Sequence, residues 1–482
     1  MACQYGNSFG EVFDIEVGAF TMRLPDGPKT PAWLQLLQWV ADPLGYMETS
    51  FQRYGDFFTA HWGNLYPEAV FISNPQAIQE IFTAEPKLFD SGRGNRVGKV
   101  VVGEHSMLLL DGSTHQRRRR LLTPPFHGER MQAYGGLICT LAKQVSSQWT
   151  IGKPFSVRES MQEISLRVIL QAVFGLNEGP RYEELRQLLA EMMDMTVSPL
   201  RACMLFFKFL QKDLGAWSPW GSFRRRQEQI DRLLYAEIHD RRKQNDPERT
   251  DILSLMISAR DEQGEGMTDE ELHDELITLL LAGHETTASS LCWALYWIHY
   301  QPQVRDKLLQ ELSSLNENPN PTDIVRLPYL TAVCQETLRI YPPLFLTWPR
   351  ILKAPLKLGE YHFDTDTVLL PCIYLTHQRE DLYPQPKQFK PERFLERQYS
   401  PFEFFAFGGG NRRCVGAALA MFEMKLVVAT IVSNYQLALA DRRPVKPQRR
   451  GFFLAPAAGF KMVNMGRHVR QEQPSEPVGS SI

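Results

Sequence analysis

The chain has 482 residues, which is long enough for one large hydrophobic core or for two or three smaller ones. Charged residues make up 22% of it and the formal net charge is −2, which excludes a global electrostatic attraction to nucleic acid or to acidic lipid. Its seven cysteines are scattered and form no Cys-x-x-Cys pair, which argues against a disulfide framework and against a zinc site.

The two ends of the chain differ in composition from the rest. Residues 1–22 lack the basic start and the apolar stretch of a signal peptide, and no run of about 18 uncharged apolar residues occurs in the sequence. We therefore expect a soluble, cytoplasmic protein without a transmembrane anchor. Residues 469–482 are polar and rich in Pro and Ser, which predicts a disordered tail.

Between these ends, residues 23–468 are predicted to form one large domain. Residues 56–73 have the pattern of a short hairpin, helical patterning dominates from there to about residue 340, and extended segments return at 344–376 and 450–465. No internal repeat or long Gly/Ser linker marks a domain boundary. The sequence thus predicts a mostly α-helical protein with a small β portion.

A basic stretch, His115-Gln-Arg-Arg-Arg119, is the first candidate for function. His115 and Arg119 lie four residues apart and so share one face of a helix. Arg117, Arg118 and Arg120 are either simply solvated, which we favour, or a basic patch on which an acidic protein could dock.

Residues 190–220 are rich in Met, Phe and Trp. Core packing is one explanation of this composition. A long apolar access channel, or a face that rests on a membrane surface, explains it equally well.

A long helix is predicted from the capping box Thr268-Asp-Glu-Glu271 to Gln301, where Pro302 ends it. At roughly 33 residues and 1.5 Å per residue it is about 50 Å long, so it must cross the whole molecule. Its middle reads LLLAGHETTASS and places polar side chains where the helix is most buried. Such groups are costly there unless they have partners or a task.

The most specific stretch is Phe407-Gly-Gly-Gly-Asn-Arg-Arg-Cys414-Val-Gly416, which precedes an apolar helix. A dinucleotide-binding fingerprint fails because Arg413 stands where its last glycine should be, and a phosphate-binding loop fails because no Gly-Lys-Ser/Thr follows. What remains is a cysteine at the start of a helix, beside Arg412 and Arg413. There the helix dipole and the arginines favour a thiolate, which is a soft metal ligand, although a buried structural cysteine on a glycine turn is the alternative.

The stretch matches F-x-x-G-x-R-x-C-x-G, and here the chain resembles the cytochrome P450 family of haem-thiolate monooxygenases, in its soluble bacterial type. The family pattern on its long central helix is matched by Ala282-Gly283-His284-Glu285-Thr286. A Glu-x-x-Arg motif is supplied by Glu336 and Arg339, followed by Pro391-Glu-Arg-Phe394, whereas the same pattern at Glu183 and Arg186 is interpreted as a solvated helix face. The basic motif departs from many relatives, since His115 stands where they have tryptophan.

The resemblance implies the P450 fold and a haem b cofactor whose iron is bound by Cys414. It implies that Glu336, Arg339 and Arg393 form a buried ion network that fixes the fold. The resemblance implies two groups of cofactor-binding residues. Four side chains bind the haem propionates, namely His115, Arg119, Arg350 and Arg412. Five residues surround the ring and its ligand loop, namely Ala282, Phe407, Gly408, Cys414 and Gly416.

Thr286 and Glu285 are the catalytic candidates. A mid-helix threonine can donate to the carbonyl of Ala282 and bend the helix, and Gly283 tolerates the distortion. The bend would form a groove in the helix that accepts dioxygen, and Thr286 and Glu285 would relay protons to the dioxygen. The alternative is that the hydroxyl of Thr286 only forms this hydrogen bond within the helix. His284 is expected to face away and to be structural.

The resemblance further implies a hydrophobic substrate, such as a fatty acid or terpenoid, and electrons from a separate ferredoxin and ferredoxin reductase, with the chain a monomer. The implied pocket is lined by residues 91–107, 190–220, the central helix near Ala282, 344–348 and 454–458. Arg93 or Arg96 is a candidate anchor for a carboxylate. Two rival functions remain, an enzyme that uses peroxide or rearranges a hydroperoxide, and a non-catalytic haem- or lipid-binding protein.

Overall fold

The structure is a computed structural model that describes residues 24–468 apart from 64–65, 127, 176–177, 196–209, 216–217, 245, 247 and 458. The predicted N-terminal segment 1–22, the predicted tail 469–482 and most of the Met- and Phe-rich part of 190–220 therefore lie outside the described residues.

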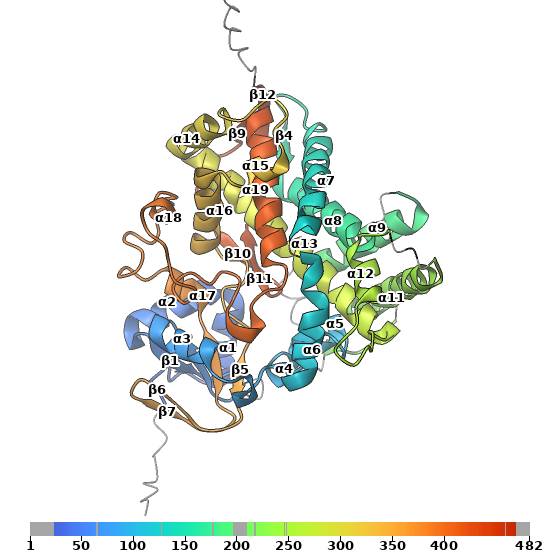
Figure 1. Ribbon diagram of the computed structural model, residues 1–482. Coiled ribbons are helices and arrows are strands. Elements are labelled where there is room, and N and C mark those ends of the chain that lie inside the picture. The colour runs from blue at the N-terminus through green and yellow to red at the C-terminus, as the bar shows by residue number, and fades with distance from the viewer. Residues whose placement is uncertain are drawn as a thin grey trace, which may run out of the picture.

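Helices make up most of the described chain (Figure 1). Those of the first half are α1 (Ala32–Ala41), α2 (Pro43–Tyr54), α3 (Pro75–Thr83), α4 (Ser91–Gly94), α5 (Lys99–Val102), α6 (Gly112–Leu122), α7 (Glu129–Ser146), α8 (Val157–Phe174), α9 (Pro180–Met195) and α11 (Pro219–Gln244). Those of the second half are α12 (Ile252–Ser258), α13 (Asp269–Tyr300), α14 (Pro302–Leu312), α15 (Pro321–Ile324), α16 (Pro328–Ile340), α17 (Ile373–His377), α18 (Arg393–Glu396) and α19 (Ala417–Asn434).

The strands form small sheets, and the largest is five-stranded in the order β1-β2-β8-β5-β3. The strands are β1 (Phe57–Ala60), β2 (Ala69–Ile72), β3 (Phe89–Asp90), β4 (Pro154–Ser156), β5 (Arg350–Leu352), β6 (Leu356–Leu358), β7 (Tyr361–Phe363), β8 (Val368–Pro371), β9 (Tyr435–Leu439), β10 (Pro447–Arg450), β11 (Phe453–Pro456) and β12 (Lys461–Arg467). β1 and β2 pair antiparallel, which confirms the hairpin predicted at 56–73, and β2 continues parallel to β8. The later strands confirm the extended segments at 344–376 and 450–465.

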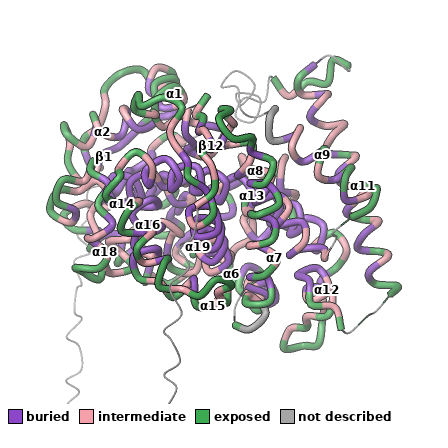
Figure 2. The backbone as a smooth tube through the Cα atoms, turned by 90° about the horizontal axis from the view of Figure 1, so that it is seen from above, coloured by how far each residue is buried: buried purple, intermediate pink, exposed green. Residues whose placement is uncertain are grey.

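Helix α13 is the central element that the sequence predicts. Thr268 and Glu271 form the predicted capping box, and Gln301 caps the other end before Pro302 begins α14. Most of its residues are buried on all sides, because it packs against α8, α11, α16 and α19. Figure 2 shows the buried residues gathered along α13, α16 and α19, while the outer faces of α9 and α11 are exposed.

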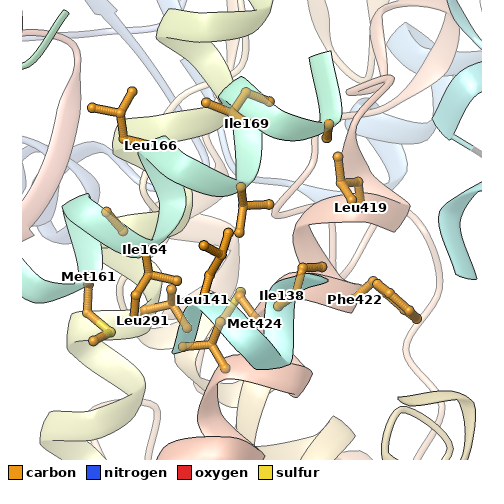
Figure 3. Close-up of a cluster of buried hydrophobic side chains, with 14 of the residues drawn as sticks. Ile138, Leu141, Met161, Ile164, Leu166, Ile169, Leu291, Leu419, Phe422 and Met424 are labelled. Carbon is orange, nitrogen blue, oxygen red and sulfur yellow. The ribbon is translucent and has the colours of Figure 1, made fainter. Parts of the chain in front are cut away.

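The core around α13 is aliphatic. Figure 3 shows side chains from four helices that meet there, namely Ile138 and Leu141 of α7, Met161, Ile164, Leu166 and Ile169 of α8, Leu291 of α13, and Leu419, Phe422 and Met424 of α19. Each buried side chain of this size stabilises the fold by about 1.5–3 kcal/mol relative to an exposed one. The packing fixes α19, and with it the cysteine loop, relative to α13.

Helix α19 belongs to this core. It has a mean hydropathy of 1.5 and, alone among the helices of the described chain, is long and apolar enough to cross a membrane, but 67% of it is buried inside the protein. The contacts with α7, α13 and α16 account for its apolar composition.

The ion network predicted at α16 is present. Arg339 donates to both carboxylate oxygens of Glu336 at 2.6 and 2.9 Å, and Arg393 donates to the same carboxylate at 3.1 Å. Arg339 also donates to the carbonyl of His377 at 2.7 Å, which ties the network to the chain after β8. By contrast, Glu183 is exposed on α9 as predicted, whereas Arg186 is partly buried and also pairs with Glu163 of α8 at 3.1 Å.

Candidate active site

A cavity lies between the middle of α13 and the loop that precedes α19. Its walls come from residues far apart in the sequence, which the fold brings together. They include Asn95 and 98–109 on one side, Ile169 and Met192 from α8 and α9, 278–290 of α13, 343–350, and 406–424 from the loop and α19.

Cys414 faces this cavity. Its backbone N–H donates to the carbonyl of Phe407 at 2.9 Å, which closes the loop, and Gly416 caps α19 two residues later. The side chain is accessible from the cavity although the residue lies deep in the protein. Both Phe407 and Gly416 also line the cavity.

Without haem, the surroundings of Cys414 do not favour the thiolate in the way that the helix start predicts. Burial raises the pKa of the Cys414 thiol, and the opposing effects of the Gly416 N–H, Arg119 and Arg413 are smaller. The start of the helix therefore does not by itself make the thiolate, because desolvation outweighs it. A cation bonded to the sulfur would take the place of the proton.

The three glycines of the loop serve the turn and its packing. Gly408 and Gly410 have φ values of 66° and 63°, which favour glycine. A Cβ on Gly409 would lie 2.1 Å from the ring of Phe82, and one on Gly410 would lie 2.6 Å from the carbonyl oxygen of Phe82. The closest approach of this backbone is thus to α3; of the three glycines, Gly408 and Gly409 line the cavity.

The predicted propionate-binding residues come together at one edge of the cavity, from α6, β5 and the cysteine loop. His115, Arg119, Arg350 and Arg412 all line it. Burial, Arg412, Arg119 and Arg350 together lower the pKa of His115 to about 3. Burial and Arg412 lower the pKa of Arg350 to about 9. These shifts have one cause, the crowding of cationic groups away from water.

Asp111 is the carboxylate that binds this cationic edge, and Asp90 lies close enough to act on Arg412 as well. Asp111 accepts from Arg412 and from the backbone N–H of Gly92, the latter at 2.6 Å. Burial raises the pKa of Asp111 in spite of Arg412, and Nε of Arg412 is buried without a partner among the described residues. The edge therefore carries an excess of positive charge that suits a ligand with two carboxylates, as haem b has.

On the opposite wall, α13 has the hydrogen bond that the sequence predicts for Thr286. The hydroxyl of Thr286 donates to the carbonyl of Ala282 at 2.6 Å, and both residues line the cavity. Gly283 leaves room for Ile169, since a Cβ there would lie 2.9 Å from the end of that side chain. His284 is buried and donates to the carbonyl of Gln162 at 3.1 Å, which agrees with its predicted structural role.

Glu285 has partners that the sequence analysis did not find. Its carboxylate forms an ion pair with Arg158 and accepts from Nε2 of Gln162 at 3.1 Å, and 3% of the residue is exposed. Both partners lie on α8, more than a hundred residues away in the chain, and no local pattern marks them.

The expectation of solvation is wrong for one arginine of the basic stretch. Arg118 is 1% exposed, not solvated, and binds Glu271 and Glu275 of α13. Arg120 is solvent-exposed as predicted and pairs with Glu262 at the surface, and Arg117 is partly exposed and pairs with Asp261.

Two predictions about the pocket also need correction. Residues 450–453 line the cavity, whereas Leu454 of β11 is buried in the core, and residue 458 lies outside the described residues. Arg93 pairs with Asp366, and neither Arg93 nor Arg96 lines the cavity as a carboxylate anchor would. The other predicted walls, within 91–107 and 344–348, do line it.

Fold and site together define the class, a mostly α-helical protein whose internal cavity has Cys414 on one side and Thr286 of α13 on the other. The family model "Cytochrome P450" matches residues 25–463. Cytochrome P450 135B1 of Mycobacterium tuberculosis is 35% identical over 446 residues, which are 92% of each chain. Cytochrome P450 138 of the same organism is 32% identical over 447 residues, which are 92% of this chain and 96% of the relative.

Solved structures agree on the fold. The chain resembles "Retinoic acid bound cyanobacterial CYP120A1" with a TM-score of 0.80 and 24% identity, over 92% of this chain and 100% of that one. It resembles "Crystal structure of cytochrome P450DA heme domain" with a TM-score of 0.80 and 21% identity, over 92% and 98%. The chain belongs to the cytochrome P450 family, and is thus a haem-thiolate monooxygenase, an oxidoreductase whose cofactor is haem b.

Proposed function

We propose that Cys414 is the thiolate ligand of the haem iron and that the enzyme inserts one oxygen atom from O2 into a hydrophobic substrate. The observation that carries the proposal is the sulfur of Cys414 at a cavity whose edge is crowded with cationic side chains. When bound, the haem supplies the iron at which dioxygen is activated, and a thiolate ligand favours cleavage of the O–O bond.

The cationic edge would hold the propionates. Arg119, Arg350 and Arg412 bring more charge than Asp111 can balance, so two propionates would relieve a repulsion that the protein alone carries. His115 would donate a hydrogen bond to a propionate, whose negative charge would oppose the effect of the neighbouring arginines on the pKa of this imidazole.

Thr286 and Glu285 would supply protons on the other side of the cavity. The hydroxyl of Thr286 lines the cavity, where it could donate to dioxygen once it leaves the carbonyl of Ala282. Glu285 is held by Arg158 and Gln162, so proton delivery requires its carboxyl group to turn from that pair toward the cavity that it lines.

The substrate would be hydrophobic, a fatty acid, a terpenoid or a similar compound. Support comes from the aliphatic and aromatic lining above α13, which includes Val101, Met192, Phe223 and Phe453. The family implies an external redox partner, which would be a ferredoxin with its reductase. We propose that the monomeric enzyme works in the cytoplasm.

The test is reconstitution with a ferredoxin system, reduced nicotinamide cofactor, a library of lipids and isotopically labelled oxygen gas. The proposal expects a product that carries one labelled atom and depends on the reductase. Equal turnover with peroxide and no reductase would favour the peroxide-using alternative. If Thr286→Ala and the unaltered protein both stay at background with every lipid, a non-catalytic binding protein would be favoured.

A further inference from the structure

A buried histidine after β8 lies between the ion network of Glu336 and the cysteine loop, residues 403–416. His377 is 0% exposed and ends the short helix α17. Its backbone carbonyl accepts from Arg339 at 2.7 Å, and Nε2 of its ring accepts from the backbone N–H of Phe405 at 3.1 Å. One residue therefore contacts the ion network with its backbone and the cysteine loop with its side chain.

The protonation state of His377 follows from these bonds. A backbone N–H can only donate, so Nε2 carries no proton, and the imidazole is neutral with its proton on Nδ1. Burial, together with the positive charge of Arg339, lowers the pKa of His377 to about 3, which agrees with a neutral ring at pH 7. Protonation would turn Nε2 into a donor and break the bond to Phe405.

The choice of an imidazole at this place has a disadvantage. Nδ1 of His377 is buried and has no partner among the described residues, and an unsatisfied buried N–H destabilises a fold. The ring stacks on Phe404 with 5.2 Å between the ring centres, a contact that phenylalanine could make without that disadvantage. What distinguishes histidine here is the acceptor atom that binds the N–H of Phe405.

A tyrosine makes a second contact of the same kind. The guanidinium of Arg339 lies over the ring of Tyr383, 5.1 Å from its centre, and the hydroxyl of Tyr383 donates to the carbonyl of Glu403 at 3.0 Å. Tyr383 is fully buried. The cysteine loop is thus held at Glu403 and at Phe405, by two residues that both contact Arg339.

Short backbone bonds connect these points to the cysteine. The carbonyl of Phe405 accepts from the N–H of Gly408 at 2.8 Å, and the carbonyl of Phe407 accepts from the N–H of Cys414 at 2.9 Å. The ring of Phe405 also packs edge-on against Phe82, which borders the glycines of the turn. Because these contacts leave the loop little freedom, a shift of Phe405 would also move Cys414.

We propose that His377 and Tyr383 form a two-point anchor, which fixes the cysteine loop on the ion network and so positions the sulfur of Cys414. Both are positioning residues, since neither lines the cavity. The inference rests on the proposed function in taking Cys414 as the ligand of the haem iron.

Two substitutions at one position separate the acceptor from the ring. His377→Gln removes the ring but keeps an acceptor that can reach the N–H of Phe405, whereas His377→Phe keeps a ring and removes the acceptor. Hydrogen exchange of the full-length protein is measured on peptides that contain Phe405. The amide of Phe405 should exchange about tenfold faster in His377→Phe and within about twofold of the unaltered rate in His377→Gln.

The haem-loaded protein gives a second readout, the reduced, carbon monoxide-bound spectrum followed over time. The band of the thiolate-bound haem should decay about tenfold faster in His377→Phe and at the unaltered rate in His377→Gln. His299→Phe is the matched control, because His299 donates to the carbonyl of Leu295 within α13 at 2.7 Å and does not line the cavity.

Tyr383→Phe removes only one hydroxyl and should speed the exchange of residues 403–408 about threefold, so it tests the anchor even where the variants at position 377 do not fold. Equal results in His377→Gln and His377→Phe, a loss in His377→Gln alone, an equal change in His299→Phe, or unchanged exchange in Tyr383→Phe would overturn the anchor. Hydrogen exchange does not require haem. Absence of any haem spectrum in the unaltered protein would instead count against the proposed function.

Discussion

Two buried clusters of charge in this molecule differ in their balance. Around Glu336, two arginines and several backbone carbonyls satisfy one another, and the cluster lies away from the cavity. Around Arg412, three arginines and a histidine face the cavity with Asp111 as their carboxylate. A buried cluster whose opposite charges balance one another maintains the fold, whereas a buried cluster with an excess of one charge can bind a ligand of the other charge.

The balanced cluster should be the more sensitive to substitution. Glu336→Gln leaves two buried arginines without their anion and should lower the free energy of unfolding by about 3–5 kcal/mol. Urea denaturation of the haem-free and haem-loaded protein measures this. A loss confined to the haem-loaded form would place Glu336 in cofactor binding and break the comparison.

Removing a cation from the cluster around Arg412 should stabilise the haem-free protein but weaken the binding of haem. Arg350→Leu removes a buried cation that burial and Arg412 disfavour, so the haem-free protein should gain about 1–3 kcal/mol of stability. The affinity for haem should fall about 10- to 100-fold, because a charge-assisted bond to a propionate is lost. Titration with haemin and thermal denaturation give both quantities.

The control for that variant is Arg93→Leu. Arg93 pairs with Asp366 at the surface and does not line the cavity, so its loss should leave haem affinity unchanged. A haem-free Arg350→Leu protein that is less stable than the unaltered one would show that the cluster is balanced after all.

A third buried cluster contains His273, which can donate to both of its carboxylate partners only when it is protonated. His273 donates from both ring nitrogens, to Asp274 at 2.9 Å and Asp231 at 3.0 Å, and stacks on Tyr235, while His105 faces Asp274 from the cavity wall. Burial lowers the pKa of His273, but the hydrogen bonds to these carboxylates outweigh it and raise the pKa to about 9.

The sign of its pH dependence follows from that shift. The folded pKa lies above the ordinary 6.5, so the stabilisation is complete below about pH 6.5 and is lost as the pH rises through 9. Its size is about 3 kcal/mol at most. Denaturation at pH 6 to 10 should show this loss in the unaltered protein and a smaller one in His273→Gln; identical profiles would contradict it.

The smallest effect on stability is expected at Thr286. Thr286→Ala removes one bond to the carbonyl of Ala282 and should change the free energy of unfolding by about 1 kcal/mol or less. Product formed per reduced cofactor should nevertheless fall about tenfold or more, since a proton donor is lost. Thr286→Ser keeps the hydroxyl and should retain most of the product yield.

Local patterns predicted the features that depend on few residues. The capping box and Pro302 delimit α13, and the ion network of Glu336 follows from the family motif around it. The turn at Cys414 was also predictable, because glycine spacing marks it. In each case the interacting residues are close in sequence, or they belong to a series of motifs that the family resemblance supplied.

Long-range pairs could not be predicted from spacing. Arg118 resembles its solvated neighbours in sequence, and only packing of α6 against α13 decides that it is the buried one. Arg158 finds Glu285 across two helices in the same way. The direction of the pKa shift of Cys414 was missed because desolvation depends on the whole fold, not on the helix that follows.

The reduced, carbon monoxide-bound absorption spectrum tests the central claim most directly, with Cys139→Ser as a control at a cysteine outside the cavity. The account predicts the strongly red-shifted band of a thiolate-bound haem in the unaltered protein and in the control, and its loss in Cys414→Ser. A thiolate spectrum that survives in Cys414→Ser would contradict it.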